Sequence, residues 1–220
     1  MSRGKKSEWT TDIILIDIIN FSGLDAKKQL EIITYLTKSY TKMINKILEN
    51  SNMTLHGLIL GYIPTGDGFY CILNPRLKGF GTILGLSFNY FSEQIAKRYP
   101  YFQGLRTAVH TGKIHEFIDI LGHKNYIGDG LNDCARYLEL RNYTISTMMV
   151  SNVAYENFKN FLFRYEDFDK LLQEREFKYS SPYIFRDKVG NKREGRLVWL
   201  RKGGIINPPN TNYNSILSRT

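Results

Sequence analysis

Residues 11–21, TDIILIDIINF, place the strongest constraint on the fold. The run is short, β-branched and apolar, which is typical of a central strand buried on both faces of a sheet. From residue 24 to residue 48 the apolar side chains instead recur every three or four positions, as they do along one face of an amphipathic helix. A buried strand followed directly by such a helix predicts a mixed fold in which helices cover a sheet.

The rest of the hydrophobic pattern continues this alternation. Strand-like segments are expected at residues 54–62, 69–73, 105–111, 148–151 and 196–201, and helices at 77–95, 129–140 and 153–161. The last strand is expected to pair with residues 177–185. The order β-α-β-β-α-β predicts the α+β class, with a ferredoxin-like split βαβ core and added C-terminal strands. We expect residues 11–202 to form one domain, residues 1–10 a polar N-terminal segment, and residues 203–220, rich in Gly, Pro and Asn, a flexible tail.

The charge of the chain is placed unevenly. Lys and Arg number 30 against 21 Asp and Glu, which gives a net charge of +9. Residues 1–6 carry three cations without an acid, residues 186–220 carry eight cations and two acids, and residues 7–185 are neutral. Nucleic-acid-binding domains usually carry a basic face through the fold, so no stable nucleic-acid partner is expected.

Cysteine usage and the N-terminal sequence bear on the compartment. Cys71 and Cys134 lie far apart without metal-ligand spacing, which suits a reducing environment. The N-terminal sequence fits neither a signal peptide nor a membrane span, since acids interrupt its apolar run. We therefore expect a cytoplasmic protein with no membrane association.

Two carboxylates are candidate metal ligands. Asp17 lies within the buried strand, where an ionised carboxylate is costly unless it is paired or bound to a metal. The strands expected at residues 54–62 and 69–73 would form a hairpin, and Asp67 lies in TGDG at its tip. Alone, Asp17 would simply end a strand or pair with a Lys, and Asp67 would serve the turn. A split βαβ sheet brings that tip beside the first strand, and two converging carboxylates suit Mg²⁺ together with substrate phosphates.

Two further segments are candidate phosphate and ribose contacts. The turn through Phe21 and Ser22 lies between the first strand and the first helix, where free amides bind phosphate, although Ser22 could equally be the helix N-cap. Asn132 and Arg136 are four residues apart and so share one face of the third helix, suited to a ribose oxygen and a phosphate. The alternative is a surface helix in which Arg136 pairs with Glu139 or Asp133. The four histidines have no zinc spacing and are expected to be structural or exposed.

In this order, these segments resemble the class III nucleotidyl cyclase catalytic domain, the adenylate/guanylate cyclase family, from about residue 13 to residue 200. Four motifs carry the resemblance: Asp17-Ile18-Ile-Asn-Phe21-Ser22, Gly66-Asp67, Arg106-Thr-Ala-Val-His110-Thr-Gly112, and the helix motif formed by Gly128, Asn132 and Arg136. The resemblance implies cyclisation of a nucleoside triphosphate, in which the ribose 3′-oxygen attacks the α-phosphate and pyrophosphate leaves.

The resemblance also implies roles for individual residues. Asp17 and Asp67, with the carbonyl of Ile18, would hold two Mg²⁺ or Mn²⁺ ions per active site. Asn132 would orient the ribose, and Arg136 would stabilise charge on the α-phosphate. In the family these last two side chains serve the site of the other subunit, which implies a homodimer with shared active sites. In the family a Lys near the C-terminal strands contacts the terminal phosphates of the substrate, and Lys192 is our choice for it among Lys188, Lys192, Arg193 and Arg196.

The chain departs from the family at the two base-reading positions. Ile63 stands where adenylate cyclases have Lys and guanylate cyclases have Glu. Asn125 stands where adenylate cyclases have Asp or Thr and guanylate cyclases have Cys. Ile63 cannot hydrogen-bond a purine, whereas the amide of Asn125 can both donate and accept. This pattern resembles the pyrimidine cyclases of bacterial Pycsar antiphage systems, whose cyclic UMP or cyclic CMP acts on a downstream effector. UTP is slightly favoured over CTP. The alternatives are an adenylate cyclase with an atypical base pocket and a catalytically inactive nucleotide-binding domain.

Overall fold

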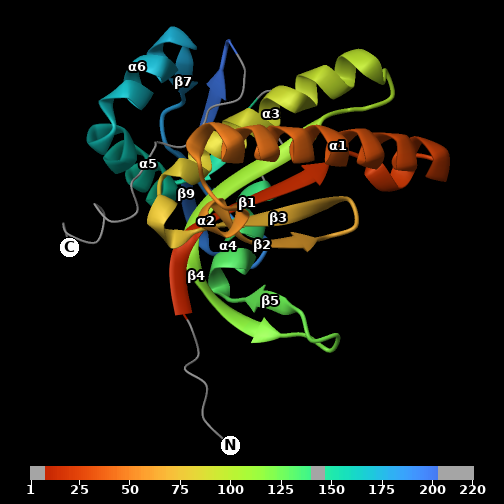
Figure 1. The fold of residues 1–220 in the computed structure, drawn as a ribbon, viewed down its shortest axis with the longest axis horizontal. Coiled ribbons are helices and arrows are strands. Elements are labelled where there is room, and N and C mark those ends of the chain that lie inside the picture. Colours follow the sequence, from red (N-terminus) through yellow and green to blue (C-terminus); the bar gives the residue numbers. More distant parts are fainter. Residues whose placement is uncertain (1–7, 140–146, 203–220) are drawn as a thin grey trace, which may run out of the picture.

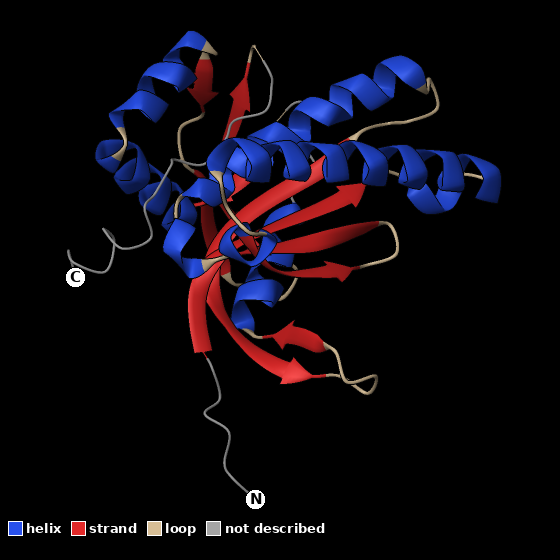
Figure 2. Ribbon diagram, in the orientation of Figure 1, coloured by secondary structure: helices blue, strands red, loops and turns tan. Residues whose placement is uncertain are grey.

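The computed structural model describes residues 8–139 and 147–202, which form a sheet with helices on both faces (Figure 1, Figure 2). Its strands are β1 (Glu8–Ile18), β2 (Ile59–Pro64), β3 (Gly68–Leu73), β4 (Leu105–Ile118), β5 (Lys124–Ile127), β6 (Met148–Ser151), β7 (Phe177–Tyr179), β8 (Tyr183–Arg186) and β9 (Lys192–Leu200). Its helices are α1 (Ala26–Ser51), α2 (Leu55–Leu58), α3 (Phe80–Arg98), α4 (Asp129–Leu138), α5 (Asn152–Arg164) and α6 (Glu166–Glu174), with 3₁₀ turns η1 (Phe21–Gly23) and η2 (Pro75–Leu77).

The strand order confirms the expected α+β fold. The main path of the sheet runs β2-β3-β1-β4-β6-β9-β7, with β5 paired to β4 and β8 paired to β9. Strand β1 is central and antiparallel to both β3 and β4, whereas β4 and β6 are parallel. Strand β9 pairs with β7 and β8, as expected for residues 177–185. None of the helices in the described ranges has an apolar stretch long enough to cross a bilayer.

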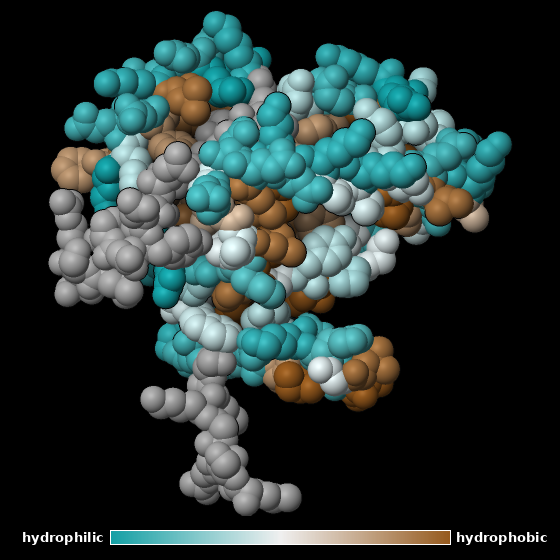
Figure 3. Space-filling model, viewed as in Figure 1, coloured by the Kyte–Doolittle hydropathy of each residue, from teal (hydrophilic) through white to brown (hydrophobic). Residues whose placement is uncertain are grey.

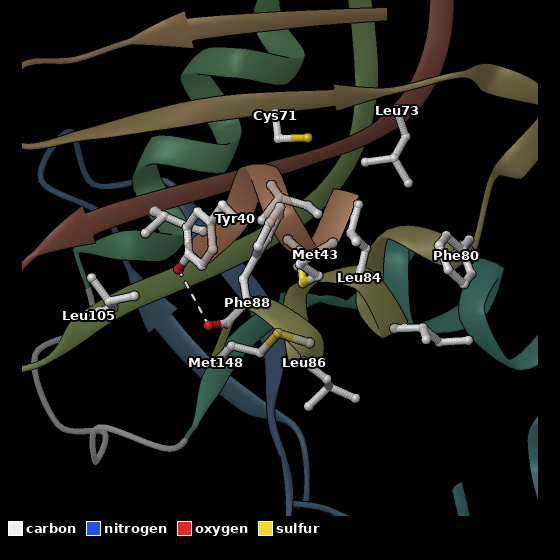
Figure 4. Close-up of a cluster of buried hydrophobic side chains, with 14 of the residues drawn as sticks. Tyr40, Met43, Cys71, Leu73, Phe80, Leu84, Leu86, Phe88, Leu105 and Met148 are labelled. Atoms are coloured by element: carbon white, nitrogen blue, oxygen red, sulfur yellow. Dashed lines mark hydrogen bonds between the residues drawn. The ribbon is translucent and has the colours of Figure 1, made fainter. Parts of the chain in front are cut away.

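Strand β1 is buried on both faces, as its sequence predicts. Ile14 and Ile16 belong to the larger core, formed with α1 and α3, whereas Ile13 and Leu15 belong to a second core beneath α4. In the larger core, the Tyr40 hydroxyl donates to the Phe88 carbonyl over 3.3 Å (Figure 4). Because side chains alternate along a strand, successive residues of β1 point alternately into the core beneath α1 and α3 and into the core beneath α4.

Asp12 and Asp17 lie on opposite faces of β1, and Asp12 has a structural role. Its buried carboxylate accepts the amides of Gly79 at 2.6 Å and Gly81 at 3.0 Å, and the Thr111 hydroxyl at 2.6 Å. These contacts cap the start of α3. Burial raises the pKa of Asp12, although its three hydrogen bonds oppose that shift.

The boundaries differ from the expected ones where side-chain capping decides them. Helix α1 begins at Ala26, and its N-cap is Asp25, which accepts the Lys28 amide over 3.0 Å. The alternative in which Ser22 is the N-cap is therefore wrong. Residues 55–58 are helical rather than extended, because the Thr54 hydroxyl accepts the Gly57 amide over 3.1 Å and caps a single turn.

Two elements extend beyond the expected pattern. Strand β4 continues to Ile118 and forms a hairpin with β5, whereas the sequence pattern predicts a strand only at residues 105–111. Helix α6 was not expected at all. Strand β1 begins at Glu8, inside the expected polar segment, and the expected tail at 203–220 lies outside the described residues.

Candidate functional site

The hairpin between β2 and β3 brings Asp67 beside the end of β1. The Ile18 amide donates to the Asp67 carbonyl over 2.9 Å, and Asp17 lies opposite Gly68 in the β1–β3 register. A Cβ at residue 68 would lie 1.9 Å from the Ile16 carbonyl oxygen, so only glycine lets the hairpin close this tightly over β1. The two carboxylates that the sequence singles out therefore lie together.

Asp17 also has a cationic neighbour, to which the sequence pattern gave no role. Arg106 is the cross-strand neighbour of Asp17 on β4, and its Nε donates to Asp17 Oδ2 over 2.8 Å. Burial raises the pKa of Asp17, and the negative charge of Asp67 adds to the rise, while Arg106 opposes both. Two carboxylates thus lie together with one guanidinium, which pairs with Asp17, and this group of three side chains has a net negative charge.

The donor set suits a hard divalent cation. Asp17 and Asp67 offer carboxylate oxygens, and the carbonyl is the only atom that Ile18 offers because its side chain packs in the larger core. In residues 8–139 and 147–202 no group of three or more His, Cys, Asp or Glu side chains could enclose a metal. Mg²⁺ is commonly held by one or two carboxylates together with substrate phosphates, so these residues fit Mg²⁺ or Mn²⁺ bound jointly with a triphosphate.

Free amides follow directly after these ligands. The Ile19 amide donates to the Gly104 carbonyl over 3.0 Å, but the next three amides, of Asn20, Phe21 and Ser22, form no hydrogen bond within the described part of the chain. Asn20 has φ +55°, a left-handed conformation that turns the chain before η1. Successive free amides in such a turn can bind phosphate oxygens, which is the contact that the sequence indicates for Phe21 and Ser22.

Helix α4 packs closely on β1 and β4 near Gly112, in the part of these strands away from Asp17. A Cβ on Gly112 would lie 2.5 Å from Gly130 Cα, so the helix meets β4 backbone to backbone. The buried residues of α4 are Gly130, Leu131, Cys134, Tyr137 and Leu138. Asn132 is exposed and Arg136 is half-buried, and both lie off this buried face. These two side chains therefore do not face the chain's own sheet.

Arg136 is held by an ion pair that the sequence raised as an alternative. Its Nη1 lies 3.0 Å from Glu139 Oε1, and Lys188 Nζ lies 3.1 Å from the same oxygen. Lys192, our sequence choice for the triphosphate contact, is exposed at the start of β9 opposite Arg186. The structure thus places Lys188 beside Arg136, a contact that depends on the turn between β8 and β9 and leaves no signal in the sequence.

The two base-reading positions lie on strands that are not paired in the sheet but are in contact with each other. Ile63 on β2 packs against the core beneath α4, and Asn125 lies on β5. The Tyr126 hydroxyl donates to the Leu60 carbonyl over 2.8 Å and joins β5 to β2. Asn125 Oδ1 accepts the Tyr126 amide over 2.8 Å, and the Asn125 amino group forms no hydrogen bond within the described residues.

His110, from the same motif as Arg106, supports α4 from below. Its Nδ1 lies 2.9 Å from the Ser151 hydroxyl, and its ring stacks on Tyr137 with centroids 5.6 Å apart. Ser151 is fully buried and caps α5 by accepting the Ala154 amide over 3.2 Å. Burial lowers the pKa of His110 to about 4. His110 is therefore a neutral structural residue, and Ser151 has no access to a substrate.

Comparisons with known proteins place the fold. No protein-family model matches the sequence, and no curated protein matches it. Among solved structures, the catalytic core of a rhodopsin-guanylyl cyclase with converted specificity, in complex with ATPalphaS, aligns with a TM-score of 0.59 and 15% identity over 91% of this chain and 100% of that chain.

Two further structures agree with this result. The guanylate cyclase domain of RhGC from Catenaria anguillulae, in complex with GTP, aligns with a TM-score of 0.56 and 15% identity over 89% of this chain and 100% of that chain. An adenylate/guanylate cyclase/hydrolase from Silicibacter pomeroyi aligns with a TM-score of 0.56 and 14% identity over 90% of this chain and 99% of that chain. At such low identity the likeness is one of architecture, and residues 8–139 and 147–202 have the fold of adenylate and guanylate cyclase catalytic domains.

Proposed function

We propose that this protein is a metal-dependent nucleotide cyclase that converts a pyrimidine nucleoside triphosphate, preferentially UTP, into the 3′,5′-cyclic nucleotide and pyrophosphate. The observation that carries the proposal is the convergence of Asp17 and Asp67 beside three free amides, on a cyclase fold. Carboxylates with surplus negative charge next to amides that bind phosphate suit a triphosphate delivered with a divalent cation.

Different residues of the chain would serve different parts of the reaction. Bound at Asp17 and Asp67, Mg²⁺ or Mn²⁺ would lower the pKa of the ribose 3′-hydroxyl and offset the charge of the leaving pyrophosphate. The amides of residues 20–22 would bind phosphate oxygens. Asn132 would fix the ribose, and the guanidinium of Arg136 would stabilise the charge that develops as the 3′-oxygen bonds to the α-phosphorus and the bond to pyrophosphate breaks.

The proposed active form is a homodimer with two shared sites. Asn132 and Arg136 do not face their own sheet, so we place them in the site of a second copy. The hairpin of β4 and β5 next to α4 also exposes apolar side chains at its tip: Ile118 is 61%, Ile120 101% and Leu121 73% exposed (Figure 3). A contiguous exposed apolar patch is typical of an interaction surface, and a second copy would cover it.

The available hydrogen-bonding group of Asn125 supports uracil over cytosine. The Oδ1 of Asn125 already accepts the Tyr126 amide, whereas its amino group forms no hydrogen bond within the described residues, so we expect the amino group to meet the base. Uracil presents an acceptor, O4, at the position where cytosine presents an amino group. Ile63 adds no polar partner for a purine edge.

The proposal is tested by incubating the protein with Mn²⁺ and each of the four ribonucleoside triphosphates separately and identifying the products by chromatography and mass spectrometry. Cyclic UMP is the expected main product. Asn125→Asp, which replaces the donor with an acceptor, should shift preference toward CTP. Consumption of ATP alone would make the protein an adenylate cyclase with an atypical pocket. No product with any triphosphate would make it an inactive nucleotide-binding domain.

A role in antiphage defence rests on the resemblance to Pycsar cyclases. Cells expressing the wild-type protein with its neighbouring genes should accumulate the cyclic nucleotide on phage infection and survive better than cells expressing Asp67→Asn. Equal survival of both would remove the defence role and leave the enzymatic proposal untouched.

A further inference from the structure

Two cationic side chains, one on α4 and one in the turn between β8 and β9, meet at one carboxylate beside the exposed face of α4. Arg136 Nη1 and Lys188 Nζ lie 3.0 Å and 3.1 Å from the same atom, Glu139 Oε1. The Lys188 amide also donates to Glu139 Oε2 over 3.4 Å. Burial would raise the pKa of Glu139, but the hydrogen bonds from Arg136 and Lys188 outweigh it and hold that pKa below its ordinary value. Glu139 is therefore a shared anion between two cations.

The turn that carries Lys188 is anchored to α4. The buried carboxylate of Asp187 accepts the amides of Val189 at 3.1 Å and Asn191 at 2.9 Å, and Arg193 Nε at 3.0 Å. Arg193 Nη1 in turn lies 2.8 Å from Asp133 on α4. These contacts fix the backbone of Lys188 relative to the helix that carries Arg136, so the meeting at Glu139 is built into the fold.

The contact leaves most of the Arg136 guanidinium available. An Arg side chain has five N–H donors in a rigid planar fork. Glu139 takes one end of this fork, and within the described residues no side chain bonds the edge formed by Nε and Nη2. That edge can bind two phosphate oxygens at once. Glu139 thus fixes the plane of the guanidinium without occupying its phosphate-binding edge.

A carboxylate in this place would repel a triphosphate unless it were neutralised. Lys188 supplies that neutralisation, since it shares Glu139 with Arg136 and leaves the three-residue cluster with a net positive charge. We propose that Glu139 is a positioning residue that aims the free edge of Arg136 at the substrate held by a second copy, and that Lys188 keeps Glu139 from repelling that substrate. This inference rests on the proposed function of Arg136.

The test separates kcat from KM for the triphosphate that the wild-type protein consumes. Glu139→Ala should lower kcat about tenfold with little change in KM, since losing an orienting partner typically costs 10–100-fold, and Glu139→Gln, which keeps an acceptor, should recover most of it. Glu156→Ala is the matched control, because Glu156 forms the same i,i+3 pair with Lys159 on α5, at 2.7 Å. A kcat for Glu139→Ala that is unchanged or higher would overturn the positioning role.

Lys188 is tested through binding. Lys188→Ala should raise KM about fivefold, the scale of a partly exposed ion pair, and adding Glu139→Gln should return KM to the wild-type value, because no uncompensated anion remains. A raised KM that the second substitution leaves unchanged would overturn the neutralising role.

A second readout does not depend on turnover. In calorimetric titration, inorganic triphosphate should bind Lys188→Ala about fivefold more weakly than the wild type, and the Lys188→Ala/Glu139→Gln variant as well as the wild type. Equal binding by all three would overturn the charge argument. If no nucleotide is turned over but this series behaves as expected, the cyclase proposal fails while the anion-binding cluster stands.

Discussion

The carboxylate half of the site, Asp17, Asp67 and Arg106, and the cation half, Arg136, Lys188 and Glu139, are built as opposites. The first combines two acids with one cation, which pairs with Asp17, and in the second, two cations share one acid. Each half is therefore partly neutralised within its own chain and keeps a surplus charge of opposite sign. The ion pairs within each half spare it an unpaired buried charge. The surplus charge attracts a ligand: a metal ion at one half and a phosphate at the other.

The largest expected effect comes from emptying the carboxylate half. Asp67→Asn removes one of two metal ligands and should lower turnover at least about 1000-fold, because the charge on the transferred phosphate then goes uncompensated. The dimer should persist in analytical ultracentrifugation, since Asp67 lies in a turn. Asp169→Asn, at an exposed position on α6, should retain full activity. Substantial turnover by Asp67→Asn would remove this residue from the carboxylate half.

A smaller effect, a gain in metal affinity, is expected when Arg106, the cation of the carboxylate half, is removed. Arg106→Ala should tighten Mn²⁺ binding about fivefold to tenfold in the absence of nucleotide, because a metal ion then displaces no guanidinium from Asp17. Electron paramagnetic resonance of free Mn²⁺ measures this directly, with Arg164→Ala as the control. Unchanged or weaker Mn²⁺ binding would show that Arg106 does not compete with the metal.

A third effect concerns the stability of the support beneath the cation half. His110 is neutral in the folded protein, with a pKa of about 4 against the ordinary 6.5. As pH falls below 6.5, His110 takes up a proton in the unfolded chain but not in the folded chain. The free energy of unfolding therefore decreases between pH 6.5 and 4. Between pH 7 and pH 5 this should cost about 2 kcal/mol of unfolding free energy.

Urea denaturation at the two pH values measures that loss. His110→Gln should flatten the pH dependence by the stated amount, whatever its effect at pH 7, while His123→Gln, at an exposed position, should leave the slope of the wild type. An identical slope for His110→Gln and the wild type would show that His110 titrates normally in the folded protein.

Most of the fold could be predicted because its central strands and helices have clear hydrophobic periods. Strand β1 is apolar on both faces, and α1 buries a side chain every three or four residues. The far half of β4 was missed because Lys113, His115 and Glu116 interrupt its pattern where the hairpin leaves the body of the protein. The start of α1 was misplaced because either Ser22 or Asp25 could cap it, and only the backbone geometry selects Asp25.

The site could be predicted only in so far as local motifs carry it. Asp17, Asp67, Asn132 and Arg136 stand in short recognisable patterns, and the structure brings the first two together. The partners that neutralise them come from elsewhere in the chain: Arg106 through the β1–β4 register, and Lys188 through a turn that a buried Asp187 holds against α4. Such contacts depend on tertiary packing between segments far apart in sequence, which no single-segment pattern contains.

The most direct test of the two complementary halves is to mix subunits that each lack a different half. Asp17→Ala and Arg136→Ala should each be inactive alone, because every site in either homodimer lacks a metal ligand or its arginine. Mixed in equal amounts and allowed to exchange, half of the dimers should carry one intact site, which should restore about a quarter of the wild-type activity. A mixture as inactive as its components, although the subunits exchange, would contradict the shared-site arrangement.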